Sequence, residues 1–262
     1  MRRYLRLLAT QARASLLVDF QYRLDLLLDL VLAGLGTASA LVPLLILFSR
    51  RTTLAGWSWP DALIVVAWFN VLKGFLGAVI QPSLQQVVEH IRKGTLDFVL
   101  IKPADSQFLV STSRFEFREA ADCVAGLAIL VYALAKIGKV PSVGAMAATA
   151  LLLLCAGTIL YAIWIMVVSL AFVFVKVDNL SYLFLSIYDA ARWPSSVFRG
   201  AFAILFTFVL PLALMTTFPA LAILDRIAAR QLLGALTGAV LFFTASRLVW
   251  LRAIRRYTSA GG

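Results

Sequence analysis

The sequence predicts an all-α membrane protein that crosses the bilayer several times, and three observations lead to this fold class. Of the 262 residues, 62% are hydrophobic and 14% are charged, whereas soluble domains are nearer half apolar and a quarter charged. Several apolar runs reach the about 20 residues that a helix needs to cross ~30 Å of hydrocarbon. The sequence has no series of alternating ten-residue strands of the kind that builds a membrane barrel, so the spans are helices.

The N-terminal residues 1–22 carry arginines beside leucines in a basic amphipathic pattern. This pattern is typical of a helix that lies on an anionic membrane surface. A cleavable signal peptide is the alternative, because Ala38-Ser39-Ala40 resembles a cleavage site. We expect no cleavage, because Asp25 and Asp29 lead the apolar stretch and its hydrophobicity continues past that site.

We expect six membrane-spanning helices within one domain over residues 1–262. The first four run over about 24–48, 61–80, 117–135 and 144–175. Residues 176–199 then show apolar positions at helical spacing and read as an interfacial helix that ends at Trp193-Pro194. A fifth span starts near Phe198, and the sixth covers about 232–251. Because Pro211 and Pro219 remove backbone hydrogen bonds, residues 211–231 are expected to form short helices at the outer surface.

The distribution of basic residues predicts the orientation. The net charge of +11 would suggest nucleic acid in a soluble protein, but in a membrane protein Lys and Arg collect on the cytoplasmic side. Seventeen of the 24 basic residues fall on the side of the termini, the 81–114 segment and the 176–199 segment, against six in the opposite loops. We therefore expect both termini and these two segments in the cytoplasm, with no nucleic-acid partner.

The longest polar interruption, residues 81–114, is the largest surface that the chain can offer to a soluble partner. Leu84, Val87, Val88 and Ile91 form an apolar face at i, i+3, i+4 and i+7, and Gly94 follows where a helix C-cap is expected. A helix this short has little stability by itself. It must pack against the membrane domain, a partner, or both, and the alternative is a solvated connector.

The run Ile91-Arg-Lys-Gly-Thr-Leu-Asp-Phe-Val-Leu-Ile-Lys-Pro103 resembles the cytoplasmic signature of type-2 ABC transporter permeases. These are six-span subunits whose ATPase is a separate polypeptide. Three further matches follow in order: Ala191-Arg-Trp-Pro194, Leu210-Pro211, and Phe218-Pro219-Ala220 with Leu224. The sequence departs from the family pattern at Leu224-Asp225-Arg226, where a glycine is expected after the leucine.

The resemblance implies that 81–114 contains a coupling helix that sits in a cleft of the ATPase. The residues implied in coupling are Leu84, Val87, Val88, Ile91, Arg92, Lys93, Gly94, Leu96, Asp97, Lys102 and Pro103. Pro211, Phe218 and Pro219 would shape an outer gate. The partners implied are two copies of an ABC ATPase, which binds ATP and Mg²⁺, a second permease subunit, identical or homologous, and membrane lipids. The expected role is export of a hydrophobic, amphipathic or cationic small molecule across a bacterial inner membrane.

The residues themselves favour a motor on another chain. The sequence has no Gly-x-x-x-x-Gly-Lys-[Ser/Thr] phosphate loop, since Gly138-Lys139-Val140 lacks the earlier glycine and the hydroxyl residue. Cys123 and Cys155 match no metal-ligand spacing, and His90 is the single histidine. We therefore expect a non-catalytic chain that binds no cofactor and no metal.

Charges inside the spans suggest an ion pair and an alternative function. Asp25 and Asp29 are four residues apart and share a helix face, and Lys73 lies at a comparable depth of the second span. We predict an Asp29–Lys73 ion pair, with a structural role favoured. The rival hypothesis is a secondary transporter coupled to protons through Asp25, Asp29 and Lys73.

A third hypothesis is a membrane enzyme that acts on lipids through acidic side chains at the start of the third span. Glu116, Glu119 and Asp122 recur there at three-residue spacing. A solvated face at the rim of the bundle is the favoured interpretation, because the sequence supplies neither a reactive group nor a metal-ligand set for catalysis.

Overall fold

The computed structural model describes residues 2–21, 23–172, 185–200, 205–206 and 211–257. Within these residues, five helices are long and apolar enough to cross a membrane. They are Leu27–Arg50, Trp59–Arg92, Phe117–Ile137, Val143–Phe172 and Ala229–Arg255. These helices confirm an all-α, multi-pass membrane protein, and most of the predicted fifth span lies outside the described residues.

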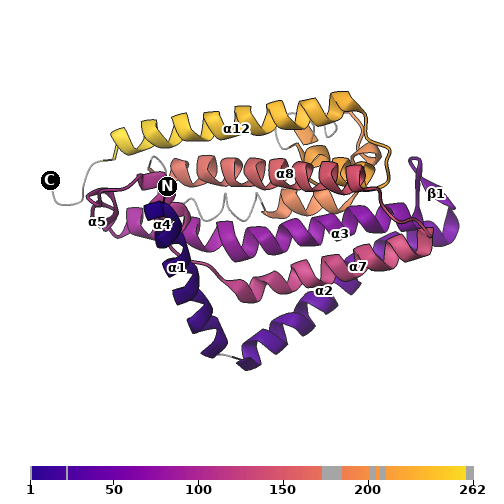
Figure 1. Ribbon diagram of the computed structural model, residues 1–262, viewed down its shortest axis with the longest axis horizontal. Helices are drawn as coiled ribbons and strands as arrows, with labels where there is room; N and C mark the ends of the chain where they lie inside the picture. The colour runs from indigo at the N-terminus through magenta and orange to yellow at the C-terminus, as the bar shows by residue number, and fades with distance from the viewer. Residues whose placement is uncertain (1, 22, 173–184, 201–204, 207–210, 258–262) are drawn as a thin grey trace.

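The N-terminal helix α1 (Arg2–Gln21) lies across one end of the bundle, at a steep angle to the other helices (Figure 1). Next, α2 (Arg23–Arg50) contains Pro43 and exposes most of its apolar side chains. A two-residue hairpin, β1 (Thr53–Leu54) and β2 (Trp57–Ser58), then connects α2 to the second span. Its turn residues Ala55 and Gly56 both have positive φ, as in the turns that favour tight hairpins.

The second span and the first part of the 81–114 segment form one continuous helix. It comprises α3 (Trp59–Phe75), a π-helical turn η1 (Leu76–Ile80) and α4 (Gln81–Arg92). At ~1.5 Å per residue its 34 residues extend about 50 Å, well beyond ~30 Å of hydrocarbon. The helix predicted over 84–93 is present as α4, but the second span does not end before it, because the helix continues through Pro82.

Pro82 explains the π-helical turn. A proline has no N–H to donate to the carbonyl four residues earlier, and that carbonyl belongs to Ala78. The backbone N–H of Glu116 donates to Ala78 O instead, at 2.9 Å. The free carbonyl is therefore satisfied from another part of the chain, and the helix axis continues.

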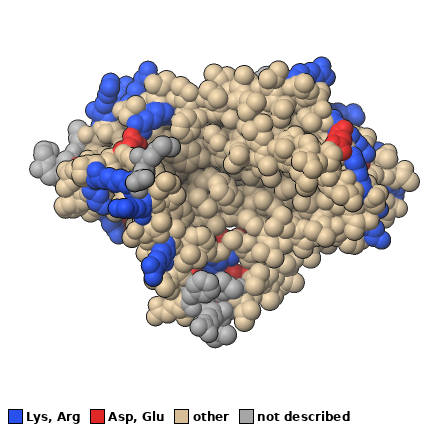
Figure 2. All heavy atoms as spheres, viewed as in Figure 1, with Lys and Arg blue, Asp and Glu red and all other residues tan. Residues whose placement is uncertain are grey.

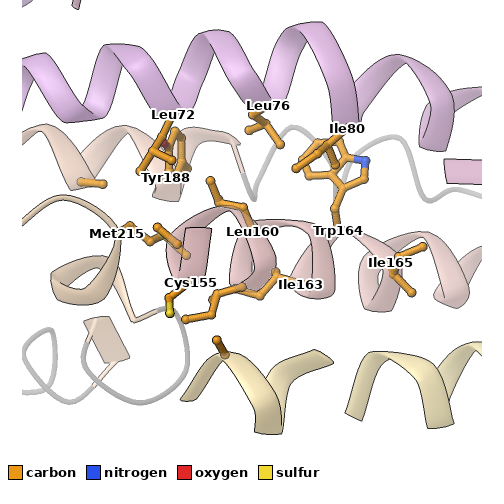
Figure 3. Close-up of a cluster of buried hydrophobic side chains, with 14 of the residues drawn as sticks. Leu72, Leu76, Ile80, Cys155, Leu160, Ile163, Trp164, Ile165, Tyr188 and Met215 are labelled. Carbon is orange, nitrogen blue, oxygen red and sulfur yellow. The ribbon is translucent and has the colours of Figure 1, made fainter. Parts of the chain in front are cut away.

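The core lies between α3 and α8 (Val143–Ser169). Figure 3 shows Leu72, Leu76 and Ile80 facing Leu160 and Trp164 of α8, and all five side chains are buried. The short turn η3 (Leu170–Phe172) continues α8, and α12 (Ala229–Arg255) packs on the other side of α8. This three-helix layer is the frame that holds the rest of the chain.

The helix α7 (Ala121–Ile137) approaches α3 closely. A Cβ atom at Gly126 would lie 2.6 Å from Ala67 O, and one at Gly74 would lie 2.6 Å from Cys123 Sγ. Small residues allow such backbone contact between membrane helices. The absence of side chains at these two positions therefore sets the distance between the second and third spans.

The two ends of the bundle differ. The start of α1, the end of α12, α4 and α5 lie at one end, and the hairpin lies at the other (Figure 1). Two short helices, the π-helical η7 (Ala213–Thr217) and α11 (Phe218–Ile223), pack against α8. They are the short helices expected in 211–231, and as at Pro82, a proline follows the π-helical turn closely.

One predicted segment lies at the other end of the bundle. The described part of 176–199 includes η4 (Asp189–Arg192) and η5 (Ser195–Val197). Trp57 Nε1 of the hairpin donates to Ser196 Oγ at 3.2 Å. Because the helix from Trp59 to Arg92 separates the hairpin from 81–114, residues 195–197 cannot lie on the side of 81–114.

The predictions of a helix on the cytoplasmic surface over 176–199, and of a fifth span that starts there at Phe198, were therefore wrong for the described residues. Arg192 and Arg199 had been counted with the 81–114 side. Moving them narrows the excess of basic residues on that side without reversing it.

Candidate functional site at the 81–114 segment

The end of α4 is fixed by backbone geometry. Gly94 has a φ of +66°, and its N–H donates to Ile91 O while the N–H of Thr95 donates to His90 O. These two bonds define a Schellman C-cap, which requires a left-handed residue at the glycine position. His90 Nδ1 and Thr95 Oγ1 add a 2.7 Å hydrogen bond across the same turn.

The apolar face of α4 points into the bundle. Leu84 and Val87 are buried, and Val88 and Ile91 are partly buried against the same core. The sequence left open the membrane domain, a partner, or both for this face, and the structure shows it packed against the membrane domain. Leu96, at the start of α5 (Asp97–Leu100), is also buried.

The exposed large apolar side chains of the segment lie beyond α4. Phe98 is 68% exposed and Ile101 is 78% exposed, and residues three apart are neighbours on one face. The predicted coupling residues that are exposed are Arg92, Lys93, Lys102 and Pro103. Figure 2 shows that basic side chains gather at this end of the molecule. The segment thus presents an apolar pair bordered by positive charge.

The return of the segment to the bundle is tied to α4. The N–H of Arg114 donates to Ser83 Oγ at 3.0 Å, and Ser83 Oγ donates to Arg114 O. Ser113 Oγ donates to Gln86 Oε1 at 3.0 Å. Because Ser83 is fully buried, these bonds hold both ends of the segment against each other without water.

The N-terminal helix α1 forms a second attachment. Ser15 Oγ accepts from the N–H of Phe115 at 3.1 Å, and Asp19 Oδ2 accepts from the N–H of Phe117 at 2.7 Å. Tyr4 OH accepts from the N–H of Asp105 at 3.2 Å. Tyr4, Ser15 and Asp19 are separated by 11 and then 4 residues, and this spacing places them on one face of α1. That spacing was the signal in the sequence for this contact.

A third attachment connects α6 (Ser106–Ser111) to α8 and α12. Arg247 Nη1 donates to Asp105 Oδ1 at 3.1 Å and to Gln107 Oε1 at 3.0 Å, and Arg247 Nη2 pairs with Asp105 Oδ2. Gln107 Nε2 donates to Tyr161 OH at 3.0 Å, and Tyr161 OH bonds Ser111 Oγ at 2.8 Å. We call these five residues the polar junction.

Asp105 also begins α6, because its Oδ1 accepts from the N–H of Phe108 at 3.0 Å. Partial burial raises the pKa of the Asp105 carboxyl, but the hydrogen bonds from Arg247 and Phe108 outweigh this effect and hold the pKa below its usual range. The sequence pattern did not indicate Arg247 or Tyr161, because their partners are 50 or more residues away along the chain.

The charged residues at the base of the first three spans form a cluster different from the one predicted. Lys73 Nζ lies 2.8 Å from Asp122 Oδ2, and Asp29 Oδ2 lies 4.0 Å from Arg118 Nε. Asp29 and Lys73 line the same small pocket but form no ion pair with each other among the described residues. The predicted Asp29–Lys73 pair is therefore corrected: α7, packed tightly on α3, supplies the closer carboxylate.

The two other acidic residues named for a catalytic role are engaged with basic neighbours or lie beside this cluster. Glu116 pairs with Arg114 at 2.8 Å and with Arg118 at 3.7 Å, and Glu119 lines the same pocket as Lys73. In the described part of the chain, no three His, Cys, Asp or Glu side chains are placed to hold a metal ion.

At the opposite end, Pro211 and Pro219 are buried and Phe218 is half-buried. Asp225 has a φ of +56°, so it occupies a left-handed conformation at the position where the resemblance led us to expect a glycine. Lys139 Nζ donates to Leu224 O at 2.7 Å and pairs with Asp225 Oδ2 at 2.8 Å. These contacts offset the backbone cost of the non-glycine residue, and they connect two loops at this end of the bundle.

Arg226 and Asp61 form a further connection across this end. Arg226 Nη1 donates to Asp61 Oδ2 at 2.9 Å, and Asp61 is buried. The same carboxylate accepts from the N–H of Ser58, the N-cap of α3. Asp225 and Arg226, which stand where a glycine was expected to follow Leu224, thus have a structural role.

Comparison with protein families agrees with this architecture. The family model described as "ABC-2 family transporter protein" matches residues 35–261. No curated protein and no solved structure matches the chain. The family match covers all the predicted spans except the start of the first, and it includes the 81–114 segment. The chain is therefore a membrane-spanning subunit of an ABC transporter and belongs to the ABC-2 transporter family.

Proposed function

We propose that this chain is the permease subunit of an ATP-driven exporter in a bacterial inner membrane, with both termini and the 81–114 segment in the cytoplasm. Two permease subunits, identical or homologous, would enclose the path, and two ATPase subunits would bind ATP and Mg²⁺. Family membership supports an ATPase partner. The cargo in this proposal is a hydrophobic, amphipathic or cationic small molecule, in keeping with the resemblance.

The continuous helix from Trp59 to Arg92 is the observation that carries the mechanism. It joins the core of the bundle to the exposed apolar pair Phe98 and Ile101 at its end. Because hydrogen bonds from Ser83, α1 and the polar junction fix this segment on three sides, a displacement of its tip would move α3 with it. In our proposal the ATPase contacts α5 and the basic residues around it, and nucleotide-driven closure of the ATPases changes the position of α3.

In this proposal the ATPase contacts the C-terminal end of α4 and the residues that follow it, instead of the apolar face of α4. Leu84 and Val87 are buried in the bundle, so they support the helix from within. Arg92, Lys93, Lys102 and Pro103 remain candidates for direct contact, because all four are exposed. Gly94 and Leu96 would set the direction of the chain between Arg92–Lys93 and Lys102–Pro103.

The test is co-purification of the chain with a candidate ABC ATPase from the same genome, together with the ATP hydrolysis rate of the complex. Ile101→Asp places a charge at the centre of the proposed contact, and an unpaired charge in an interface core is costly. We expect at least about a tenfold loss of ATPase binding, equivalent to ~1.4 kcal/mol. Val140→Asp is the matched control, because Val140 is 90% exposed and lies at the opposite end.

Equal ATPase binding by the two variants would contradict the docking surface. Transport driven by a proton gradient without any ATPase would contradict the whole proposal and support the secondary transporter. Correct insertion of both variants is checked by their yield and thermal unfolding, because neither side chain packs in the core.

A further inference from the structure

A large groove on the side of the bundle is not part of the ATPase contact proposed above. Its volume is about 1060 Å³, and its walls come from α3 with η1, α8, α12 and α6. The face of the molecule in Figure 2 is hollowed over this region. Two of its lining residues, Leu154 and Phe75, are 71% and 38% exposed, so the groove opens on the surface that would face lipid.

The length of the groove matches one leaflet of a bilayer. Along α8 its lining runs from Ala150 to Tyr161, which is about 17 Å at ~1.5 Å per residue. Half of a ~30 Å hydrocarbon core is of the same size. This stretch is lined by aliphatic and aromatic side chains, such as Leu153 and Phe243, that suit an extended hydrocarbon chain.

The glycine in α8 helps to make this space. A Cβ atom at Gly157 would lie 3.2 Å from Phe75 Cε1, so a side chain there would press on the wall opposite. Gly157 therefore keeps the groove open at the middle of its length.

The groove ends at the polar junction. Asp105, Gln107, Ser111, Tyr161 and Arg247 all line it, and they lie at the same end of the bundle as the 81–114 segment. The side chains of Arg247 and Asp105 are 35% and 36% exposed. The bonds to Asp105 and Gln107 use three of the five N–H donors of the guanidinium group. Arg247 can thus donate to a further anionic oxygen.

We propose that this groove binds one membrane phospholipid with a zwitterionic headgroup of the phosphatidylethanolamine type. One acyl chain lies between α3 and α8, the phosphate accepts from Arg247, and the amine lies near Asp105. The headgroup assignment follows from charge: the Arg247–Asp105 pair carries no net charge, so a headgroup with zero net charge leaves nothing unpaired in a half-buried site. In the proposed orientation, the lipid belongs to the cytoplasmic leaflet.

The site has a structural consequence for the coupling segment. Phe108 and Ser111 of α6 line the groove, and α6 follows α5 directly in the segment. A bound lipid would therefore stabilise the polar junction and, through it, the exposed tip at Phe98 and Ile101.

The experiment uses the full-length chain in lipid nanodiscs that contain phosphatidylethanolamine with a photoactivatable diazirine in one acyl chain. A parallel sample contains phosphatidylglycerol with the same labelled chain. Cross-linked peptides are identified by mass spectrometry. Ala150→Trp fills the groove, and Ala147→Trp is its matched control, because Ala147 is exposed on the same helix but does not line the groove.

We expect the phosphatidylethanolamine probe to cross-link within 71–80 and 150–161. Ala150→Trp should reduce this signal at least fivefold, whereas Ala147→Trp should leave it unchanged. The phosphatidylglycerol probe should label these peptides several-fold less. Equal labelling by the two variants, or labelling no stronger than on the exposed face of α2, would overturn the site. Equal labelling by the two lipids would overturn the headgroup assignment, and cross-links to a second copy of the chain would show that a protein interface covers the groove.

Discussion

Replacing Arg247 with Met should destabilise the protein by about 2–3 kcal/mol. The change removes three hydrogen bonds, two to Asp105 and one to Gln107. A hydrogen bond to a charged group contributes ~1.5–3 kcal/mol where it is buried. The full sum does not apply, because both members of the ion pair are about one-third exposed and solvent screens such pairs. Gln107 is only 3% exposed, so its unpaired carbonyl oxygen accounts for part of the loss.

The assay is thermal unfolding of the purified chain in one detergent, supported by unfolding in SDS. For a chain of this size, 2–3 kcal/mol lowers the midpoint by roughly 5–10 °C. Arg252→Met is the matched control on the same helix, since Arg252 is exposed and surface changes usually stay within ~0.5 kcal/mol. Hydrogen exchange in 105–111 should rise in the Arg247 variant and not in the control.

A double-mutant cycle with Asp105→Asn separates the ion pair from the helix cap. Asparagine caps a helix about as well as aspartate, so this change removes the charge and keeps the start of α6. We expect a coupling energy of ~1–2 kcal/mol between Arg247 and Asp105. Additive effects within ~0.5 kcal/mol, together with equal stability of the Arg247 and Arg252 variants, would refute the polar junction as a source of stability.

Three further predictions follow from the contacts. Ser83→Ala should cost ~1–3 kcal/mol, because it removes both bonds between the buried Ser83 hydroxyl and the backbone of Arg114, and faster hydrogen exchange at 113–116 would report it. Hydrogen bonds, first from Lys139 and then from Ser142, hold the pKa of Asp225 below its usual range. The stability from this pair should therefore be present above about pH 4 and be lost as the pH falls through the folded-state pKa. Asp225→Asn should reduce that acid dependence of the unfolding midpoint. Arg192→Met should lower the thermal midpoint, because it leaves Asp189 without its partner at 3.0 Å. A midpoint equal to that of the native chain would contradict a structural role for this pair.

The sequence predicted the elements that depend on local rules. Apolar length located the first four spans and the last, and Gly94 marked the end of α4 through its left-handed backbone. Pro211 and Pro219 indicated short helices within 211–231, which the structure contains as η7 and α11. The family resemblance, carried by the run from Ile91 to Pro103, agrees with the family match over 35–261.

The errors share one cause, since each depended on which segments meet in space. The second span was predicted to end near residue 80, but the N–H of Glu116 satisfies the carbonyl of Ala78 that Pro82 leaves free, and the helix continues. Lys73 was matched to Asp29 by depth, whereas the close packing of α7 on α3 gives it Asp122 at 2.8 Å.

By itself, the sequence determined the fold class, the family and the existence of a polar segment with a capped amphipathic helix. These follow from apolar length, helical periodicity and backbone restrictions at glycine and proline, all of which act over a few residues. The tertiary structure decided which face of α4 is buried, on which side residues 195–197 lie, and that Arg247 joins α12 to α6. Such contacts link residues more than 100 positions apart, so no local pattern encodes them, and only the packing of the helices brings the partners within hydrogen-bonding distance.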